Sequence, residues 1–494
     1  MKGIMIQGAS SDAGKSFLAT GLCRFLADRG VRVCPFKSQN MSNNSFVTHD
    51  GREISRAQAV QAAAARLLPE TFMNPILLKP RRDNCSQIIL DGLSIETPAD
   101  RGYYRSFAMN QGIEAIRRAL RHIEVSFDVV VIEGAGSPAE VNLNATEIVN
   151  MRVARLADVP VILVADVDRG GSLASVVGTL ELLGDDRERV KGLVFNKFRG
   201  DLELFDDAVR WVQDRTGVPV LGVMPWLKGV TIAGEDSLSL HWGRGGSSMG
   251  LSVGVVRFPG LANYTDLEPF GFEPDVELVG LDEEFPLRRL SLLDAVILPD
   301  SRAPVEDARW LRSTGLAGAL KDFAASGGRI FGMGGGYRML GLRLKAQQKG
   351  AMPQVVEGLG LLPLITDFSG APVAARTRTG TLHPSHGSLV PVAGCEMSQG
   401  WTRPEGEGAA PLLLLDGAEE GCALSGIQVA GSSLSGLFES DAFRAHWLKG
   451  LRDARGLEPV LTDTLGMKER AYDALADAVR GHLDTERLLS LMGL

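Results

Sequence analysis

The sequence of 494 residues predicts an α/β protein with two successive domains, each built around a largely parallel sheet. Residues 1 to about 235 alternate short Val- and Ile-rich runs with helical patterns, a Gly- and Ser-rich break follows at 241–250, and a second alternating pattern begins after it. Such alternation is typical of buried parallel strands separated by helices. A chain of this length also exceeds what one hydrophobic core usually supports.

The first domain, which we place at 1–240, contains a series of compact apolar runs. They read "GIMIQG", "VRVCPFK", "FDVVVIEG", "PVILVADV", "VKGLVFN" and "PVLGVMP". Helical patterns separate these runs, so we expect a doubly wound parallel sheet. In such a sheet the ligand site lies outside the carboxyl ends of the strands.

The second domain, which we place at 250–454, repeats the α/β pattern without repeating any motif. Its clearest predicted strands are "LSVGVVRFP", "LDAVILPD", "GGRIFGMG" and "VEGLGLLPL". From residue 455 to 494, Leu and Ala recur at helical spacing, which indicates a C-terminal helical segment. The break at 241–250 is polar enough to serve as a linker between the two domains.

The composition excludes several classes of protein. Hydrophobic residues make up 45%, charged residues 23%, and the formal net charge is −8, so there is no basic field for nucleic acid. We find no apolar run long enough to cross a bilayer and no signal peptide. The five cysteines are scattered and form no Cys-x-x-Cys pair. This argues against a disulfide framework or a structural zinc site and predicts a reducing cytoplasmic location.

A phosphate-binding loop follows the first predicted strand. The segment "GASSDAGKS" runs from Gly8 to Ser16 and leads into a helical pattern, so backbone N–H groups and a helix N-terminus would face phosphates. Lys15 would reach the β- and γ-phosphates and Ser16 would bind Mg²⁺, whereas Asp12 would either add a metal contact or order the loop. The expected nucleotide contacts in this loop are Gly8, Ser11, Asp12, Ala13, Gly14, Lys15, Ser16 and Phe17.

Two further strand ends carry polar residues. Glu133 ends the run "VVVIE", where a carboxylate that orders Mg²⁺ sits in phosphate-loop proteins; the alternative is a solvated glutamate at a strand end. Asn196 and Lys197 end the run "VFNK" and would read and stack on the nucleotide base. Asparagine is also an ordinary turn residue, which remains the alternative there.

The stretch "GMGGGYRMLG" at 332–341 has the pattern of a nucleophile elbow without a nucleophile. It follows the apolar run "GRIFG" and leads into a helical pattern, as the sharp turn that carries a catalytic cysteine would. Gly334 stands at the position of that cysteine.

Taken together, these segments resemble the cobyric acid synthase family. The resemblance is carried by "QGASSDAGKS", "PFKSQNMSNNS", "EISRAQAVQA", "MNPILLKP", "EGAGSPAEVNL", "ILVADVDRGG", "NKFRGD", "LANYTDLEPF" and "LSGLFESDAFRAHWL". It implies a dethiobiotin-synthetase-like ATP domain followed by a class I glutamine-amidotransferase-like domain. The implied chemistry uses ATP and Mg²⁺ to activate corrin side-chain carboxylates as acyl phosphates, which ammonia from glutamine then converts to amides.

The resemblance also implies roles for individual residues. Lys37 and Lys79 would steady phosphate and carboxylate charge together with Lys15, and Glu147 stands where the family has an aspartate in an Asn-Leu-Arg-x-x-Asp-Ile segment. Asn144 replaces the arginine of that segment. The residues expected to line the substrate side are Gln39, Asn40, Arg56, Gln58, Asp83, Ser86 and Gln87.

The second domain departs from the family at the positions that carry glutaminase chemistry. Gly334 replaces the cysteine, Ser435 in "SGLFE" replaces the histidine, and Asp300 in "PDSRAP" replaces a glycine of the oxyanion segment. Ser398 stands where the family has a further histidine. Glutamine hydrolysis needs a thiolate with a base within hydrogen-bond reach, and a carboxylate would repel the oxyanion. We therefore predict a degenerate site without glutaminase activity.

Three functions remain open from the sequence. The first is an ATP-dependent amide synthase that acts on a corrinoid or tetrapyrrole carboxylate, with ammonia supplied from solution or by a separate glutaminase subunit. The second is a related ligase with a different amine or polycarboxylate substrate. The third is a nucleotide-dependent binding or regulatory protein without catalysis, because phosphate loops also drive switches. The sequence leaves the oligomeric state open.

Overall fold

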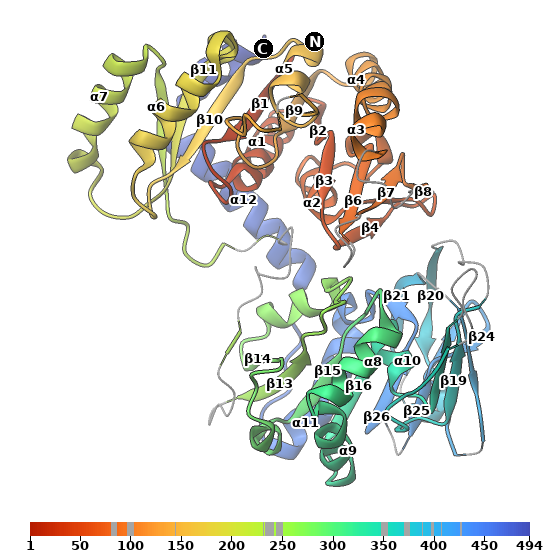
Figure 1. Cartoon of the computed structure of the whole chain (residues 1–494). Coiled ribbons are helices and arrows are strands. Elements are labelled where there is room, and N and C mark those ends of the chain that lie inside the picture. Colours follow the sequence, from red (N-terminus) through yellow and green to blue (C-terminus); the bar gives the residue numbers. More distant parts are fainter. Residues whose placement is uncertain are drawn as a thin grey trace. The chain divides into compact units, whose positions relative to one another are not determined.

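The computed structural model divides the chain into two compact units (Figure 1). The first comprises Met1–Thr48, Arg52–Glu235 and Leu465–Leu494, and the second comprises His49–Gly51 and Asp236–Thr464. The residues that the structure describes are 1–80, 86–95, 103–143, 145–230, 232, 242–243, 250–346, 354–369, 376–387, 389–396, 400–406, 408–424 and 427–494.

The first unit is built on a six-stranded parallel sheet in the order β12-β11-β10-β1-β9-β2. Its strands are β1 (Gly3–Gly8), β2 (Val33–Phe36), β9 (Val129–Glu133), β10 (Val161–Asp166), β11 (Val190–Phe198) and β12 (Val220–Pro225). Each of the six apolar runs of the first domain forms one of these strands, which confirms the predicted doubly wound α/β fold.

Helices cover both faces of this sheet. Along β1, Met5 packs into one core while Ile4 and Ile6 pack into the other, because successive residues of a strand point to opposite faces. The first core is closed by α4 (Ile113–Ser126), α5 (Met151–Ala157), α6 (Ser172–Leu182) and α7 (Asp206–Thr216). The second core is closed by α1 (Lys15–Asp28), α12 (Thr464–His482) and α13 (Thr485–Met492).

The end of the chain therefore completes the first unit. We expected a helical segment of its own from 455 to 494. In the structure α11 continues to Arg455, α12 and α13 form the predicted helices, and Tyr472, Val479 and Leu488 are buried in the core that α1 also covers. The phosphate-loop unit is thus assembled from both ends of the sequence.

A small second sheet belongs to the first unit and lies beside α2 (Arg56–Ala64) (Figure 1). Its order is β3-β6-β7-β8, and a separate β4–β5 hairpin leads into α2. Their bounds are β3 (Gln39–Met41), β4 (Ser45–Val47), β5 (Glu53–Ser55), β6 (Ile76–Pro80), β7 (Ser86–Leu90) and β8 (Leu93–Ile95). The helix α3 (Tyr103–Phe107) leads through a π-helical turn at Ala108–Gly112 into α4. This sheet carries most of the residues predicted to line the substrate side.

The second unit has its own six-stranded sheet in the order β14-β13-β15-β16-β26-β25, parallel except for β25. Its strands are β13 (Leu251–Val256), β14 (Val276–Leu281), β15 (Ala295–Leu298), β16 (Arg329–Met333), β25 (Cys422–Leu424) and β26 (Val429–Ser432). One face is covered by α11 (Asp441–Arg455) and the other by α8 (Pro304–Ser313), α9 (Leu316–Ala325) and α10 (Gly335–Met339).

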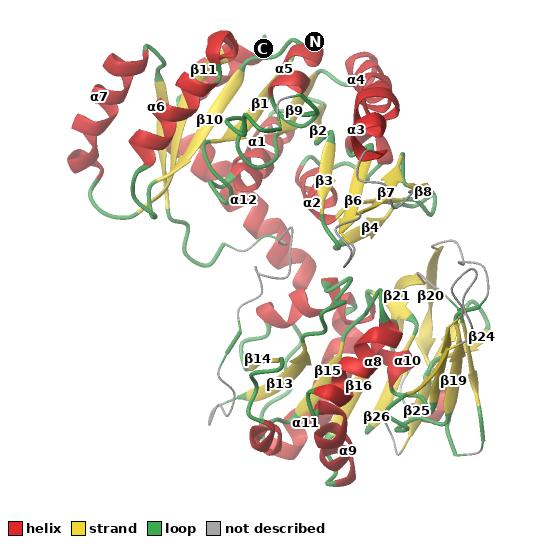
Figure 2. Cartoon of the chain, in the orientation of Figure 1, coloured by secondary structure: helices red, strands yellow, loops and turns green. Residues whose placement is uncertain are grey.

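Two antiparallel-rich sheets extend the second unit (Figure 2). The four-stranded sheet contains β17 (Arg343–Ala346), β18 (Gln354–Glu357), β19 (Leu364–Asp367) and β22 (Trp401–Pro404). The five-stranded sheet contains β20 (Arg376–Leu382), β21 (Pro391–Glu396), β23 (Leu413–Leu415), β24 (Ala418–Glu420) and β27 (Leu434–Ser435). The run "VEGLGLLPL", predicted as one strand, instead joins the end of β18 to the start of β19. Gly360 has φ +65°, which turns the chain in the central part of this run. The chain also passes close to its neighbour there, since a Cβ on Gly358 would lie 2.0 Å from the Gly341 carbonyl oxygen.

Candidate functional site

The phosphate loop lies at the carboxyl end of β1, and polar residues follow the neighbouring strands at the same edge. Gly8 ends β1, Glu133 ends β9, Asp166 ends β10, and Asn196 lies in β11 opposite Asp166. Since β11, β10, β1 and β9 are adjacent in the sheet, their carboxyl ends meet at one edge. This is where open parallel sheets bind ligands.

The loop backbone has the conformation that a close phosphate contact requires. Gly14 precedes α1 with φ +97°, and a Cβ there would lie 1.8 Å from Asn196 Nδ2. The first turn of α1 contains no acidic residue, so the positive end of the helix is not neutralised from within. Lys15 is buried and its Nζ donates to the Gly136 carbonyl oxygen at 3.1 Å. These features fit the predicted phosphate contacts of the loop.

Glu133 is the centre of the polar cluster. Its side chain is 1% exposed, Ser16 Oγ and Lys37 Nζ each lie 2.9 Å from Oε1, and Gln61 Nε2 donates to Oε2. Burial alone would raise the pKa of Glu133, but the charge and hydrogen bond of Lys37, with the charge of Lys15, lower it below its ordinary value. The carboxylate is therefore ionised and held by three side chains from different parts of the chain.

The Ser16 hydroxyl and the Glu133 carboxylate fit the ligand preference of Mg²⁺. Both offer hard oxygen atoms and they already lie in contact, and Mg²⁺ usually binds through one or two carboxylates with phosphate and water completing its shell. Within the described ranges no group of three or more His, Cys, Asp or Glu side chains gathers as a metal site. Asp12 points elsewhere: its exposed carboxylate pairs with Arg169 at 3.1 Å.

Asn196 and Lys197 hold the loop from its other side. Asn196 Nδ2 donates to the Ala13 carbonyl oxygen at 2.9 Å, and Lys197 Nζ donates to the Asp12 carbonyl oxygen at 2.6 Å and to Asp166 Oδ2 at 2.8 Å. Their predicted contact with a nucleotide base stays a prediction. Asp166 was not singled out from the sequence, although it ends a buried strand as Glu133 does. The other predicted loop residues are the exposed Ser11 and the half-buried Phe17.

The residues predicted to act on the substrate side are divided between two places. Asn40, Arg56 and Gln58 are buried around β3 and the start of α2. Gln39 accepts a hydrogen bond from the Tyr104 hydroxyl. Ser86 opens β7, where Gln87 lies opposite Lys79 in the β6–β7 register. Asp83, like Asn144 and Ser398, lies outside the described residues.

Lys79 and Glu147 have structural partners away from Glu133. Lys79 forms an ion pair with Glu53. Glu147 accepts from the backbone N–H groups of Val149 and Asn150, and from that of Arg152 at 3.1 Å, which caps the start of α5. Among the contacts described, neither side chain joins the cluster around Ser16. Their catalytic roles stay predictions.

Gln61 is a contact of Glu133 that sequence reasoning missed. It lies on α2 three residues after Gln58, and Gln58 Nε2 donates to Gln61 Oε1 at 3.0 Å. Residues three apart share one face of a helix, so the spacing in "RAQAVQA" was the available signal. Nothing in the sequence alone placed that face against Glu133.

The second unit retains the turn of a nucleophile elbow at Gly334, between β16 and α10. Gly334 has φ +50° and ψ −116°, and a Cβ there would lie 2.2 Å from Asp300 Oδ1. The same oxygen accepts from the backbone N–H groups of Ser301 at 2.8 Å and Gly335 at 2.6 Å. The Asp300 carboxylate therefore fills the space beside the turn.

Ser435 is buried at the end of β27, where it lies opposite Cys395 of β21. The backbone that follows is held by Asp266, which accepts from Gly436 N–H at 2.7 Å and Phe438 N–H at 2.8 Å. Burial raises the pKa of Asp266 to about 7, against the opposing effect of these two hydrogen bonds. A buried acid, Asp266, thus organises the backbone of this segment.

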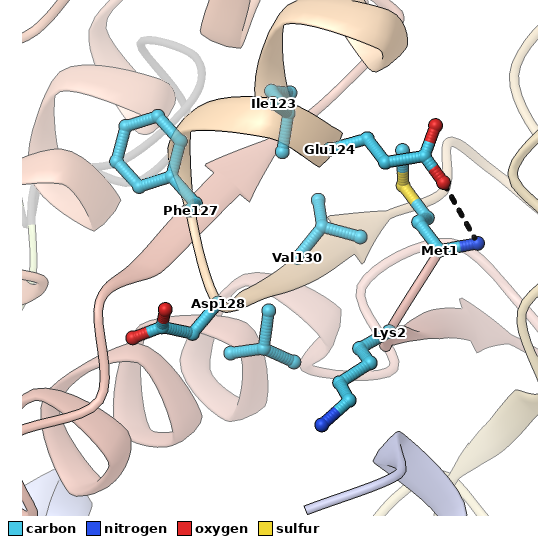
Figure 3. Close-up of a pocket in the computed structure, with 8 residues that line it drawn as sticks. Met1, Lys2, Ile123, Glu124, Phe127, Asp128 and Val130 are labelled. Carbon is cyan, nitrogen blue, oxygen red and sulfur yellow. Dashed lines mark ion pairs between the residues drawn. The ribbon is translucent and has the colours of Figure 1, made fainter.

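A surface pocket of about 450 Å³ lies at the opposite end of the central strands of the first unit (Figure 3). Met1 and Lys2 precede β1 there, Asp128 precedes β9, and the Met1 ammonium lies 3.5 Å from Glu124. Since ligands of open parallel sheets bind at the carboxyl ends of the strands, we assign this pocket no part in the candidate site. In the part of the chain that the structure describes, no helix is both long and apolar enough to cross a membrane.

Comparison with known proteins agrees with both units. Residues 4–240 match the family described as the CobQ/CobB/MinD/ParA nucleotide binding domain, and residues 252–443 match the CobB/CobQ-like glutamine amidotransferase domain. A protein of Nostoc punctiforme described as cobyric acid synthase is 43% identical over 502 residues, covering 99% of this chain and 100% of that protein. One of Geobacillus kaustophilus with the same description is 44% identical over 499 residues, covering 99% and 97%. The resemblance seen in the sequence is confirmed: the chain belongs to the cobyric acid synthase family.

Proposed function

We propose that this protein is an ATP-dependent amide synthase that converts side-chain carboxylates of a corrinoid, or a similar tetrapyrrole, to primary amides. The observation that carries the proposal is the cluster in which Ser16 of the phosphate loop and the buried Lys37 both contact the buried Glu133. Such a cluster serves phosphoryl transfer, whose catalysis depends on positioning and charge. The substrate class is inferred from the relatives described as cobyric acid synthases.

The proposed reaction has two steps. A substrate carboxylate oxygen attacks the γ-phosphorus of ATP, which forms an acyl phosphate and releases ADP. Ammonia then attacks the carbonyl carbon, phosphate leaves, and loss of a proton gives the carboxamide. We assign both steps to the domain at 1–240.

Charged side chains of the first unit would stabilise the first step. Lys15 and Lys37 provide positive charge beside the loop, where negative charge develops on the transferring phosphoryl group. Ser16 and Glu133 would hold Mg²⁺, which neutralises phosphate charge when it is bound. Arg56, at the start of α2, is a cation on the predicted substrate side. Lys79 and Glu147 keep their proposed catalytic roles, although in this structure Lys79 pairs with Glu53 and Glu147 caps the start of α5.

We also propose that the domain at 250–454 has no glutaminase activity. Gly334 has no side chain, and Ser435 cannot serve as a base near pH 7. In an elbow, the backbone N–H after the nucleophile helps to bind the oxyanion. Here that group is the N–H of Gly335, and it donates to Asp300. Ammonia would therefore come from solution or from a separate glutaminase subunit.

The proposal is tested by supplying a corrinoid carboxylate and ATP·Mg²⁺ with either ammonium or glutamine. We expect ADP release and carboxamide formation with ammonium but not with glutamine. Mass spectrometry detects the carboxamide. Lys15→Ala should reduce the rate by about 10²-fold or more, because it removes charge that meets the phosphates. Lys191→Ala, at an exposed lysine of β11, is the matched control and should leave the rate unchanged.

Three results would contradict the proposal in different ways. Equal rates with glutamine and ammonium would mean that a nucleophile lies outside the Gly334 turn. ATP turnover only with another amine, or only with another carboxylate in a panel of polycarboxylates, would favour the related ligase. No turnover with any acceptor, despite ATP binding that Lys15→Ala abolishes, would favour a nucleotide-dependent binding protein.

A further inference from the structure

Two buried glutamines connect Glu133 to the start of α2. Gln58 and Gln61 lie on the same face of this helix and both side chains are fully buried. Gln61 Nε2 donates to Glu133 Oε2, and Gln61 Oε1 accepts from Gln58 Nε2 at 3.0 Å. The two amides therefore form a hydrogen-bonded chain that ends at the carboxylate predicted to bind the metal.

The chemistry of Glu133 fixes the direction of this chain. An ionised carboxylate can only accept hydrogen bonds, so Gln61 must present its NH₂ group to Glu133 and its oxygen to Gln58. Gln58 must then present its own NH₂ group to Gln61. Its Oε1 consequently points away from the chain, and it has no hydrogen-bond partner among the described residues. The position of this unused acceptor follows from the charge on Glu133.

A buried side chain of β3 presents an unused donor. Asn40 Oδ1 accepts from the backbone N–H of Met41 at 3.0 Å, which fixes the orientation of the Asn40 amide. Its Nδ2 is buried and has no hydrogen-bond partner in the described part of the chain. An oriented acceptor on Gln58 is thus matched by an oriented donor on Asn40.

Two more unsatisfied side chains belong to the segment between β3 and the start of β4. Asn44 is fully buried with neither its Oδ1 nor its Nδ2 hydrogen-bonded within the described ranges, and the Ser45 hydroxyl is in the same state. The backbone brings both to the start of α2, since Arg56 N–H donates to the Asn44 carbonyl oxygen at 3.2 Å and Ser45 pairs with Ser55. Ser55 in turn caps the helix by accepting from Gln58 N–H at 3.3 Å. Native proteins rarely leave several neighbouring buried groups unsatisfied, unless a ligand or water completes them.

We propose that Asn40, Asn44, Ser45 and Gln58 form a subsite for a primary carboxamide of the substrate, and that Gln61 is a positioning residue that connects this subsite to Glu133. A primary carboxamide offers one acceptor oxygen and two N–H donors. The oxygen suits the Asn40 amide, and an N–H suits the Gln58 oxygen. A carboxylate has no donor, so it would leave Gln58 Oε1 unsatisfied and repel it.

The subsite would recognise the group that the proposed reaction produces. The corrinoid nature of the ligand rests on the proposed function, whereas the preference for a carboxamide rests on the side chains alone. A substrate that already carries amides would be oriented by one of them, so that a remaining carboxylate faces the phosphate loop. Gln61 would keep the Glu133 carboxylate in one orientation while the substrate binds.

The test compares the binding of two probes to the full-length protein in the presence of Mg²⁺ and a non-hydrolysable ATP analogue. One probe is a corrinoid whose peripheral side chains are primary carboxamides, and the other is the same corrinoid hydrolysed to carboxylates. Calorimetry of Gln58→Leu should show about tenfold weaker binding of the carboxamide probe, the loss expected from one or two hydrogen bonds. Binding of the carboxylate probe should change by less than about twofold.

Asn44→Ala tests the same subsite independently and should shift binding in the same direction. Gln111→Leu, at an exposed glutamine in the turn before α4, is the control and should alter neither probe. Unchanged binding of the ATP analogue shows that each variant is folded. Gln61→Leu should instead raise the Mg²⁺ concentration that half-saturates analogue binding by several-fold, since Glu133 loses the donor on Oε2.

The outcomes separate this inference from the proposed function. If Gln58→Leu and Asn44→Ala weaken both probes equally, or weaken neither, the carboxamide subsite is wrong while amide synthesis stands. If the unaltered protein binds the ATP analogue but neither corrinoid, the proposed function is wrong and the subsite fails with it. If Gln61→Leu leaves the Mg²⁺ dependence unchanged, Gln61 is not a positioning residue.

Discussion

Two glycine-rich turns of this protein have the same local design and different contents. Each follows a buried parallel strand and begins a helix, the first between β1 and α1 and the second between β16 and α10. Each depends on a glycine with positive φ, Gly14 at +97° and Gly334 at +50°. The first turn is followed by Lys15 and Ser16, whereas the second has no side chain at the position where an elbow carries its nucleophile. The comparison teaches that a strand, a glycine with positive φ and a helix can form the same kind of turn whether or not reactive side chains follow it.

The two turns also differ in how their charges are satisfied. Beside the first, the buried carboxylate of Glu133 is balanced by Lys37 and contacted by Ser16, which leaves a cationic, oxygen-rich site suited to phosphate. Beside the second, the carboxylate of Asp300 itself accepts the N–H groups that would bind an anion. The first turn is therefore suited to bind an anionic ligand. At the second turn the Asp300 carboxylate already occupies the position of such an anion.

The largest effect is expected at the first turn. Glu133→Gln removes the carboxylate from a buried ion pair whose other partner, Lys37, is 2% exposed, and removing one partner of a buried ion pair typically destabilises a protein by about 3–5 kcal/mol. The first unit should lose stability in denaturant unfolding, and ATP·Mg²⁺ should no longer stabilise the variant. Adding Lys37→Met should restore much of the stability without restoring the response to ATP·Mg²⁺. A double variant as unstable as the single one would show that the pair is not the source of the loss.

The next largest effect is a pH dependence of the second unit. The pKa of Asp266 is raised to about 7 by burial, with the nearby charges of Glu439 and Asp300 adding to the effect. Because the folded value exceeds the ordinary value of 3.8, the fold favours the protonated form. The contribution, which amounts to at most about 4 kcal/mol, is fully present below about pH 4 and is lost as pH rises through about 7.

Calorimetry at about pH 4.5 and about pH 8 should detect this loss of stability. It should appear in the unfolding transition of the second unit, which is the transition that ATP·Mg²⁺ does not shift. Asp266→Asn keeps a neutral side chain at every pH, although one of the two backbone N–H groups loses its acceptor. It should therefore be less stable than the parent at low pH, by about 1–3 kcal/mol, and that difference should shrink or reverse as pH rises. A constant difference across the range would mean that Asp266 does not titrate there.

A smaller effect is expected from adding one methyl group to the second turn. Gly334→Ala places a Cβ 2.2 Å from Asp300 Oδ1 and forces alanine into positive φ, so it should destabilise the second unit by about 2–3 kcal/mol. Asp300→Ala removes the clashing atom, and the cost of Gly334→Ala should then fall by about 1 kcal/mol or more in a double-mutant cycle. Gly318→Ala is the control: this glycine lies within α9 with open space around it, so alanine should stabilise slightly. Additive costs at 334 and 300 would contradict the contact.

The central sheets and the phosphate loop could be predicted from the sequence, whereas the small sheet could not. Strands buried on both faces must be apolar along their whole length, which is why runs such as "PVILVADV" identified the first sheet. The strands β3, β4 and β5 contain three residues each, too few for a period to be visible. The helix α2 is buried on nearly every side, so it lacks the solvent-exposed face that would give its sequence an amphipathic period.

The contents of the two turns show the same limit. The sequence predicted that Asp300 would oppose an oxyanion, but only the structure places its Oδ1 on the N–H groups of Ser301 and Gly335. Likewise Lys37 and Glu133 could each be proposed from motifs, while their ion pair depends on the pairing of β2 with β9, and the donor from Gln61 depends on how α2 packs. Residue types follow from the sequence, but partners far apart in the chain require the fold.

The smallest effect is expected from placing a thiol at the second turn. Gly334→Cys supplies the sulfur of a nucleophile, yet its Cβ would meet the same oxygen of Asp300 as alanine does. The Gly335 N–H would still donate to that carboxylate, and Ser435 would still offer no base to form the thiolate. Glutamine incubated with this variant should release glutamate only at the background rate of the parent, and a glutamine-analogue electrophile should not label it.

Further replacement of Asp300 by glycine and Ser435 by histidine removes each obstacle in turn, so any activity should require all three changes. Glutamate release from Gly334→Cys alone would mean that Asp300 does not block the turn, and that the two turns differ only by one sulfur atom.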